Sequence, residues 1–155
     1  MSTFKNGTPG TLPILDPLTF LEWQLLHFTA GEIAQPEVSG MFADPDRDQR
    51  SNLLEFGLAG NPLVNESGEL PQFEVESIEL DGVVERYFTL TFDRPVGSEL
   101  RYALLKSSKL SDWRSRPLIR VRSSVNLATQ VETLTVRESQ PIAVEDVYFR
   151  IQVSR

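Results

Sequence analysis

The spacing of the hydrophobic residues changes near residue 70, and this change divides the chain into two parts. Between residues 18 and 60 the apolar residues recur at helical intervals, whereas from residue 72 onward they alternate with polar ones. Alternation is typical of β-strands with one buried face, because successive side chains of a strand point to opposite sides. The pattern therefore predicts a helical segment followed by an all-β segment.

Two capping boxes mark the expected starts of helices in the first part. The residues TFLE (19–22) and TAGE (29–32) each place a threonine three positions before a glutamate, so that each side chain can satisfy a backbone N–H. Apolar residues between 20 and 28 cover more than one stripe of a helix, which indicates a buried helix. A short helix is also expected over residues 52–59, since Gly60 and the Asn-Pro pair after it stop helices.

Six segments of the second part have the period of a β-strand. The first two flank Asp81-Gly82, which is a strong signal for a tight hairpin. Short strands at close spacing, with no helical pattern between them, predict a small antiparallel β-sandwich or an open barrel. The expected strands cover residues 72–80, 83–92, 100–107, 117–122, 130–138 and 147–153.

We therefore expect a mainly β fold, in which a small antiparallel β-sandwich (residues 72–155) carries an N-terminal helix–loop–helix cap (18–62) after an N-terminal tail (1–17). Cap and sandwich can form one compact unit. The residues expected to be largely buried are Trp23, Phe28, Leu53, Leu54, Phe88, Leu90, Phe92, Leu104, Phe149 and Ile151.

The composition excludes several classes of function. A net charge of −7 argues against nucleic acid, because binding to phosphates needs clustered Lys and Arg. The absence of Cys removes disulfides, thiolate metal sites and cysteine nucleophiles, and a single histidine, His27, cannot supply an ordinary zinc site or a catalytic triad. No segment approaches the ~18 apolar residues that suggest a membrane span. We therefore expect no enzyme activity and no membrane insertion.

The acidic run DPDRDQRSNLLE (residues 44–55) has the ligand spacing of an EF-hand calcium loop. Calcium needs six to eight oxygen ligands, and alternate residues of a tight loop can all point inward, while a glutamate in the following helix closes the shell. The expected ligands are the side chains of Asp44, Asp46, Asp48, Asn52 and Glu55 and the backbone carbonyl of Arg50. The alternative is a solvated acidic turn whose aspartates cap the following helix.

Two features of the loop lower the expected affinity for calcium. Gln49 stands at the position where an EF-hand has a glycine for its sharp turn, so Gln49 must either adopt a positive φ at some cost or let the loop open. Arg47 and Arg50 also offset part of the negative charge.

The order Trp23, His27-Phe28, ADPDRDQRSNLLEF (43–56) and Asn61-Pro62 resembles a module found near the C-termini of large secreted bacterial proteins, whose core reads ADPDGDGLSNLLEYALG-DP. The loop is also similar to single dockerin and thrombospondin type 3 calcium loops. The specific part of the likeness covers residues 43–62, and a general likeness to a following β-rich segment extends it over residues 20–155. Both glycines of the DGDG core are absent here. The resemblance implies a noncatalytic, extracellular, calcium-dependent module.

Two functions therefore remain as hypotheses. The first is a calcium-binding structural or adhesion module of a larger surface or secreted protein, with a protein partner or self-assembly. Since the first residues carry no secretion signal, either the protein stays inside the cell or the chain is a fragment or processed piece of a longer one, as this first hypothesis requires. The second is a carbohydrate-binding sandwich, with Trp113, Tyr87, Tyr102 and Tyr148 as candidates for an aromatic sugar-binding face.

Overall fold

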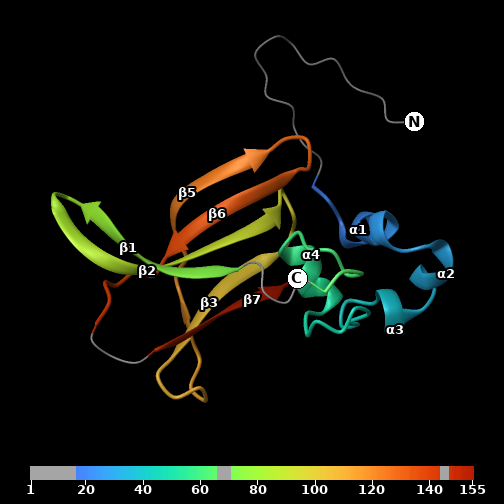
Figure 1. Cartoon of the computed structure of the whole chain (residues 1–155), viewed down its shortest axis with the longest axis horizontal. Helices are drawn as coiled ribbons and strands as arrows, with labels where there is room; N and C mark the ends of the chain where they lie inside the picture. The colour runs from blue at the N-terminus through green and yellow to red at the C-terminus, as the bar shows by residue number, and fades with distance from the viewer. Residues whose placement is uncertain (1–16, 66–70, 144–146) are drawn as a thin grey trace, which may run out of the picture.

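The computed structural model describes residues 17–65, 71–143 and 147–155, so the expected N-terminal tail lies outside the described residues except for Pro17. The described chain is mainly β, with two antiparallel sheets and a few short helices (Figure 1). The helices are gathered at one end of the sheets, on the side where the described chain begins. This arrangement confirms the expected fold class.

Four short helices form the N-terminal cap. Both capping boxes are present, because the Thr19 and Thr29 side chains accept from the backbone of Glu22 and Glu32, whose carboxylates accept from the threonines in return. An additional helix begins at Pro36, whose fixed φ suits the first helical position. The helices are α1 (Phe20–His27), α2 (Ala30–Ile33), α3 (Pro36–Ser39) and α4 (Asn52–Gly57).

The strands form a four-stranded sheet in the order β1-β2-β6-β5 and a three-stranded sheet in the order β4-β3-β7. All the pairs are antiparallel, and no helix occurs among the described residues after residue 71. All six expected strands are present, and β4 is an additional one that is too short to show an alternating pattern. The strands are β1 (Gln72–Leu80), β2 (Val83–Pro95), β3 (Arg101–Ser107), β4 (Arg114–Arg116), β5 (Ile119–Asn126), β6 (Val131–Arg137) and β7 (Tyr148–Ser154).

The hydrophobic core of the sandwich lies between the two sheets. It combines residues of β2 and β6 from the larger sheet with Leu104 of β3 from the smaller one. Leu58, directly after α4, belongs to the same cluster, so the cap contributes to the core of the sandwich. The buried members are Leu58, Leu90, Phe92, Leu104, Leu134 and Val136.

A second cluster, the aromatic cluster, holds the cap together and consists of Phe20, Trp23, Phe28 and Phe56. The ring of Trp23 lies 5.3 Å from that of Phe20 and 5.8 Å from that of Phe56, measured between ring centroids. Because Phe56 lies on α4 and the other three belong to α1 and its C-terminal end, this cluster packs α1 against α4.

The face of the larger sheet that points away from the smaller sheet carries polar side chains that interact with one another. The Glu76 carboxylate on β1 accepts two hydrogen bonds from the Arg122 guanidinium on β5, at 2.7 and 2.9 Å, and another from the Thr89 hydroxyl. These bonds hold the pKa of Glu76 below its ordinary value. Since β1 and β5 are opposite edges of the sheet, the ion pair reaches across β2 and β6. The sheet curls toward a barrel, but β1 and β5 are not paired.

Half of the residues expected to be buried are buried: Trp23, Phe28, Leu90, Phe92 and Leu104. The other five are partly buried, and three of them pack against the sandwich core: Leu54, Phe149 and Ile151, with Leu53 and Phe88 as the other two. Phe88 and Phe149 are in contact at the rim of the sandwich, with ring centroids 4.8 Å apart. The β1–β2 hairpin extends past the smaller sheet (Figure 1), and apolar side chains of the hairpin such as Val75 and Val84 are exposed.

Because Phe92 and Phe149 differ in burial, truncating them should lower the free energy of unfolding by different amounts. Phe92→Ala should lower the free energy of unfolding by about 3–5 kcal/mol, because Phe92 is completely buried. Phe149→Ala should cost about half as much, since Phe149 is only partly buried. Urea unfolding of both variants measures the two losses. Equal losses would mean that the rim is as tightly packed as the centre.

Candidate metal centre

The acidic run forms a closed loop between α3 and α4. Backbone hydrogen bonds join its two ends, since the amide of Asn52 donates to the carbonyl of Ala43 at 2.8 Å and that of Leu53 donates to Met41 at 2.9 Å. Helix α4 begins at Asn52, so the loop leads directly into the helix that joins cap and sandwich. The position of the loop is therefore set by α4.

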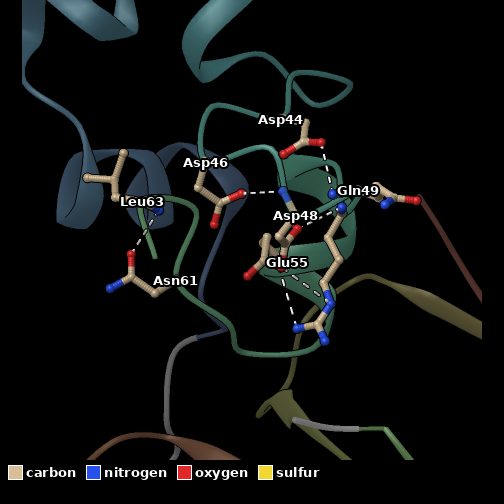
Figure 2. A network of polar contacts seen from close by, with 8 residues as sticks. Asp44, Asp46, Asp48, Gln49, Glu55, Asn61 and Leu63 are labelled. Atoms are coloured by element: carbon tan, nitrogen blue, oxygen red, sulfur yellow. Dashed lines mark hydrogen bonds and ion pairs between the residues drawn. The ribbon is translucent and has the colours of Figure 1, made fainter. Parts of the chain in front are cut away.

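Three aspartates converge inside this loop. One carboxylate oxygen each from Asp44, Asp46 and Asp48 lies within 4.8 Å of the other two. Figure 2 shows how backbone amides hold these side chains: the amide of Asp48 donates to Asp46 Oδ1, and that of Gln49 donates to Asp44 Oδ2, both at 3.1 Å. The amide of Arg50 donates to Asp48 Oδ1 at 2.8 Å. Each carboxylate thus uses one oxygen to shape the loop.

The remaining oxygens of two aspartates lack a hydrogen-bond partner. Asp44 Oδ1 and Asp46 Oδ2 are both buried at the atomic level, and no donor of the described chain reaches them. Burial raises the pKa of Asp46 above its ordinary value, and the Asp48 and Asp44 carboxylates raise it further, although the Asp48 amide opposes this. Buried oxygens of this kind are rare in folded proteins unless water or an ion contacts them.

Glu55 and Arg50 add one buried carboxylate and one cation. Glu55 lies on α4 and is 1% exposed. Arg50 Nη1 lies 3.9 Å from Glu55 Oε1, and its Nε lies 3.7 Å from Asp48 Oδ2. These separations are too long for hydrogen bonds, so the attraction is electrostatic. The sequence indicated Arg50 only as a carbonyl ligand and as a charge that lowers affinity, and did not show that its guanidinium lies near two predicted ligands, Asp48 and Glu55.

Asn52 ties the loop to α3. Its side chain is fully buried, and Nδ2 donates to the carbonyls of Val38 and Gly40, both at 2.9 Å. Asn52 Oδ1 has no hydrogen-bond partner. The donors fix the orientation of the amide, so Oδ1 is the atom that remains for a ligand.

Two residues of the acidic loop have backbone φ angles that glycine adopts more easily than other residues. Arg47 has a φ of 62° and Gln49 a φ of 76°, both in the left-handed region. These are the two positions at which the secreted module has the glycines of its DGDG core. Of the two alternatives for Gln49, the loop shows the positive φ, and Arg47 shares it.

The other residues singled out in the sequence are dispersed. Tyr87 is buried, and the Tyr102 hydroxyl donates to the carbonyl of Gly57 at 2.8 Å. The Trp113 ring is covered by the Arg150 guanidinium, 4.3 Å from its centroid, whereas Tyr148 is exposed. The four aromatic residues therefore do not form one exposed face.

Comparison with known protein families, with curated proteins and with solved structures finds no match. Within the described ranges, no helix has the length and apolar character needed to cross a membrane. The resemblance to a secreted bacterial module stays a prediction from residues 43–62.

Glycine at the strained turn should stabilise the protein. Gln49→Gly should raise the free energy of unfolding by about 0.5–1 kcal/mol, because glycine adopts a positive φ without a steric penalty. The Gln49 side chain is exposed, and its amide bond to Asp44 is retained.

Gln140→Gly is the matched control, since Gln140 is also exposed but has no positive φ. It should lower stability, because glycine only adds freedom to the unfolded chain there. A loss of stability in both variants, measured by thermal unfolding, would contradict strain at Gln49.

Proposed function

We propose that this protein is a noncatalytic structural module stabilised by one Ca²⁺ in the loop of residues 44–55. The observation that carries the proposal is the pair of buried, unpartnered oxygens, Asp44 Oδ1 and Asp46 Oδ2, within a cluster of three carboxylates. Two oxygens bound to one calcium at about 2.3–2.6 Å can be at most about 5.2 Å apart. The 4.8 Å limit of the cluster is compatible with that geometry.

The donor set favours a hard cation. The predicted ligands offer only carboxylate, amide and carbonyl oxygens, and no sulfur or imidazole belongs to the group. Oxygen ligands of this kind suit calcium and magnesium rather than zinc or copper. Glu55 and the oxygen of Asn52 would complete the shell together with the carbonyl of Arg50. For Glu55 to bind, the Arg50 guanidinium must move aside.

The ion would act through α4. Glu55 and Phe56 are neighbours on this helix, and Phe56 packs in the aromatic cluster while Leu58 packs in the sandwich core. Holding Glu55 would therefore hold the cap on the sandwich. No substrate position is implied by this set of ligands, which supports a structural role.

A weak site supports an extracellular or cell-surface location. Because of the strain at two loop residues and the competition from Arg50, we expect a dissociation constant on the order of 10⁻⁴ M, as in extracellular modules. Such a site fills at the calcium levels outside cells and stays mostly empty in a calcium-poor cytosol.

A protein partner, or a second copy of the chain, is the proposed binding partner. The cap exposes several large apolar side chains, among them Leu26 at 72% and Phe42 at 88%. Exposed apolar side chains of this size favour contact with protein, and the net charge of −7 disfavours nucleic acid.

Calcium should stabilise the protein modestly. At ~1 mM calcium, ten times the expected dissociation constant, binding adds about 1.4 kcal/mol to the free energy of unfolding. The melting temperature should rise by about 3–6 °C and fall back with chelator. Glu55→Gln should remove most of this response, whereas Glu74→Gln, on the exposed edge strand β1, should keep it. Calorimetry that detects no binding up to ~10 mM calcium would show that the loop is a solvated acidic turn.

Arg50→Gln should lower the free energy of unfolding in chelator and raise the affinity for calcium. In chelator it should cost about 1–3 kcal/mol, because the buried Asp48 and Glu55 carboxylates lose their nearby cation. Calcium affinity should rise, since the ion no longer competes with the guanidinium. Arg47→Gln is the control, because it removes the same charge from an exposed position in the same loop. An equal effect of both variants would mean that only the total charge of the loop matters.

A further inference from the structure

Strand β1 is an open edge of the larger sheet, on the hairpin that extends away from the helices (Figure 1). Among the described residues it pairs only with β2, over nine residues in unbroken register. The other edges are shorter or irregular: β4 has three residues, β7 has seven, and β5 changes register between Arg120 and Arg122. Lysine, proline and bulges keep many edge strands from pairing, and β1 contains none of them. Its outward backbone groups can therefore pair with another strand.

Near its start, β1 has an apolar face and an acidic face. Phe73 is opposite Leu90 of the sandwich core, so Phe73 and Val75 lie on the face that points toward the smaller sheet. Phe73 and Val75 are nevertheless 43% and 42% exposed. Glu74 and Glu76 lie on the opposite face, since successive side chains of a strand alternate. The same edge thus offers an apolar surface on one side and negative charge on the other.

A strand added to this edge would extend both faces of the sheet. Its side chains opposite Phe73 and Val75 would lie beside these two residues, and the side chains between them would lie beside Glu74 and Glu76. Apolar residues at the first positions would cover exposed apolar surface, and Lys or Arg at the second would offset the negative charge. The edge therefore fits a strand in which apolar and basic side chains alternate.

Charge disfavours the β1 strand of a second copy in this position. β1 carries three glutamates and neither Lys nor Arg, and the whole chain has a net charge of −7. Two paired copies of β1 would bring their carboxylates together, and like charges on neighbouring strands destabilise a sheet. Glu76 accepts from Arg122, but Glu74 and Glu79 are exposed and form no ion pair with a described residue. The edge therefore carries negative charge that a basic partner would offset.

Strand β5 of a second copy does not suit this position either, although residues 119–122 alternate apolar and basic side chains. The guanidinium groups of Arg120 and Arg122 are already bonded to Glu132 and Glu76 of their own chain. The change of register between the two arginines also interrupts the edge of β5. These observations favour a different protein as the partner.

We propose that the first half of β1 (residues 72–77) binds an extended segment of another protein, in which apolar and basic side chains alternate, as an added strand of the larger sheet. Backbone hydrogen bonds supply the pairing, Phe73 and Val75 supply the apolar contact, and Glu74 supplies the preference for a cation. The inference rests on the proposed function only in taking a protein as the partner, and it does not depend on calcium.

Nuclear magnetic resonance titration of the isotope-labelled protein with synthetic peptides tests the proposal. The probe is the capped peptide Thr-Val-Lys-Val-Lys-Val-Thr. One control peptide has glutamate in place of both lysines, and another, Thr-Val-Val-Lys-Lys-Val-Thr, keeps the composition but breaks the alternation. The probe should shift the amide signals of β1 with a dissociation constant on the order of 10⁻³ M, and both controls should bind about ten-fold more weakly.

Glu74→Gln should weaken binding of the probe by about three- to five-fold, the loss expected for one exposed ion pair. Glu37→Gln is the matched control, because it removes the same charge from an exposed position on α3, and it should bind the probe unchanged. Val75→Thr, which keeps the shape of the side chain, should weaken binding by a similar factor. Glu55→Gln should lose the calcium response and still bind the probe, so failure of the calcium site can be told apart from failure of this proposal.

Several results would overturn the proposal. One is a titration in which the probe shifts no β1 signal up to ~10 mM, which would make β1 a solvated edge without a partner. Equal binding of the charge-reversed peptide, or equal binding of the probe by Glu74→Gln and Glu37→Gln, would also contradict it. Sedimentation of the protein alone gives a further check, because a dimer that Val75→Lys abolishes would show that a second copy occupies the edge.

Discussion

Helix α4 has to pack against two partners at once, and the rest of the molecule depends on how it does so. Gly57 makes this possible: a Cβ there would lie 2.6 Å from Cγ1 of Val153 on β7, closer than atoms can approach. The carbonyl of the same residue accepts from the Tyr102 hydroxyl of β3. With α4 held on the smaller sheet, Phe56 turns to α1 and Leu58 enters the sandwich core.

The packing of α4 on the sandwich also buries negatively charged side chains. Asn52 and Glu55 lie on the first turns of α4, so fixing the helix buries both side chains along with Asp48 in the loop before it. The Arg50 guanidinium offsets part of the charge of Asp48 and Glu55, at 3.7 and 3.9 Å. An added cation would reduce the repulsion among these carboxylates, which is the physical basis of the proposed calcium site.

Local patterns allowed most elements to be predicted from the sequence. The capping boxes at Thr19 and Thr29 and the turn at Asp81-Gly82 depend on neighbouring residues alone, and all three are present. Pairings between distant segments, such as β2 with β6, leave no mark in either segment. The rim position of Phe149 was missed for the same reason: alternation shows which face of a strand is apolar, and not how far another sheet covers it.

At the candidate site, the sequence likewise could not predict where every side chain points. Spacing identified the three aspartates that converge, because alternate residues of a tight loop point the same way. It could not show the guanidinium of Arg50 beside Glu55, since a long flexible side chain is placed by its surroundings. Because α4 is held by the aromatic cluster on one side and by Val153 and Tyr102 on the other, an ion in the loop cannot move the helix far. In the proposed site, binding would therefore change how strongly the cap is held and not its position on the sandwich.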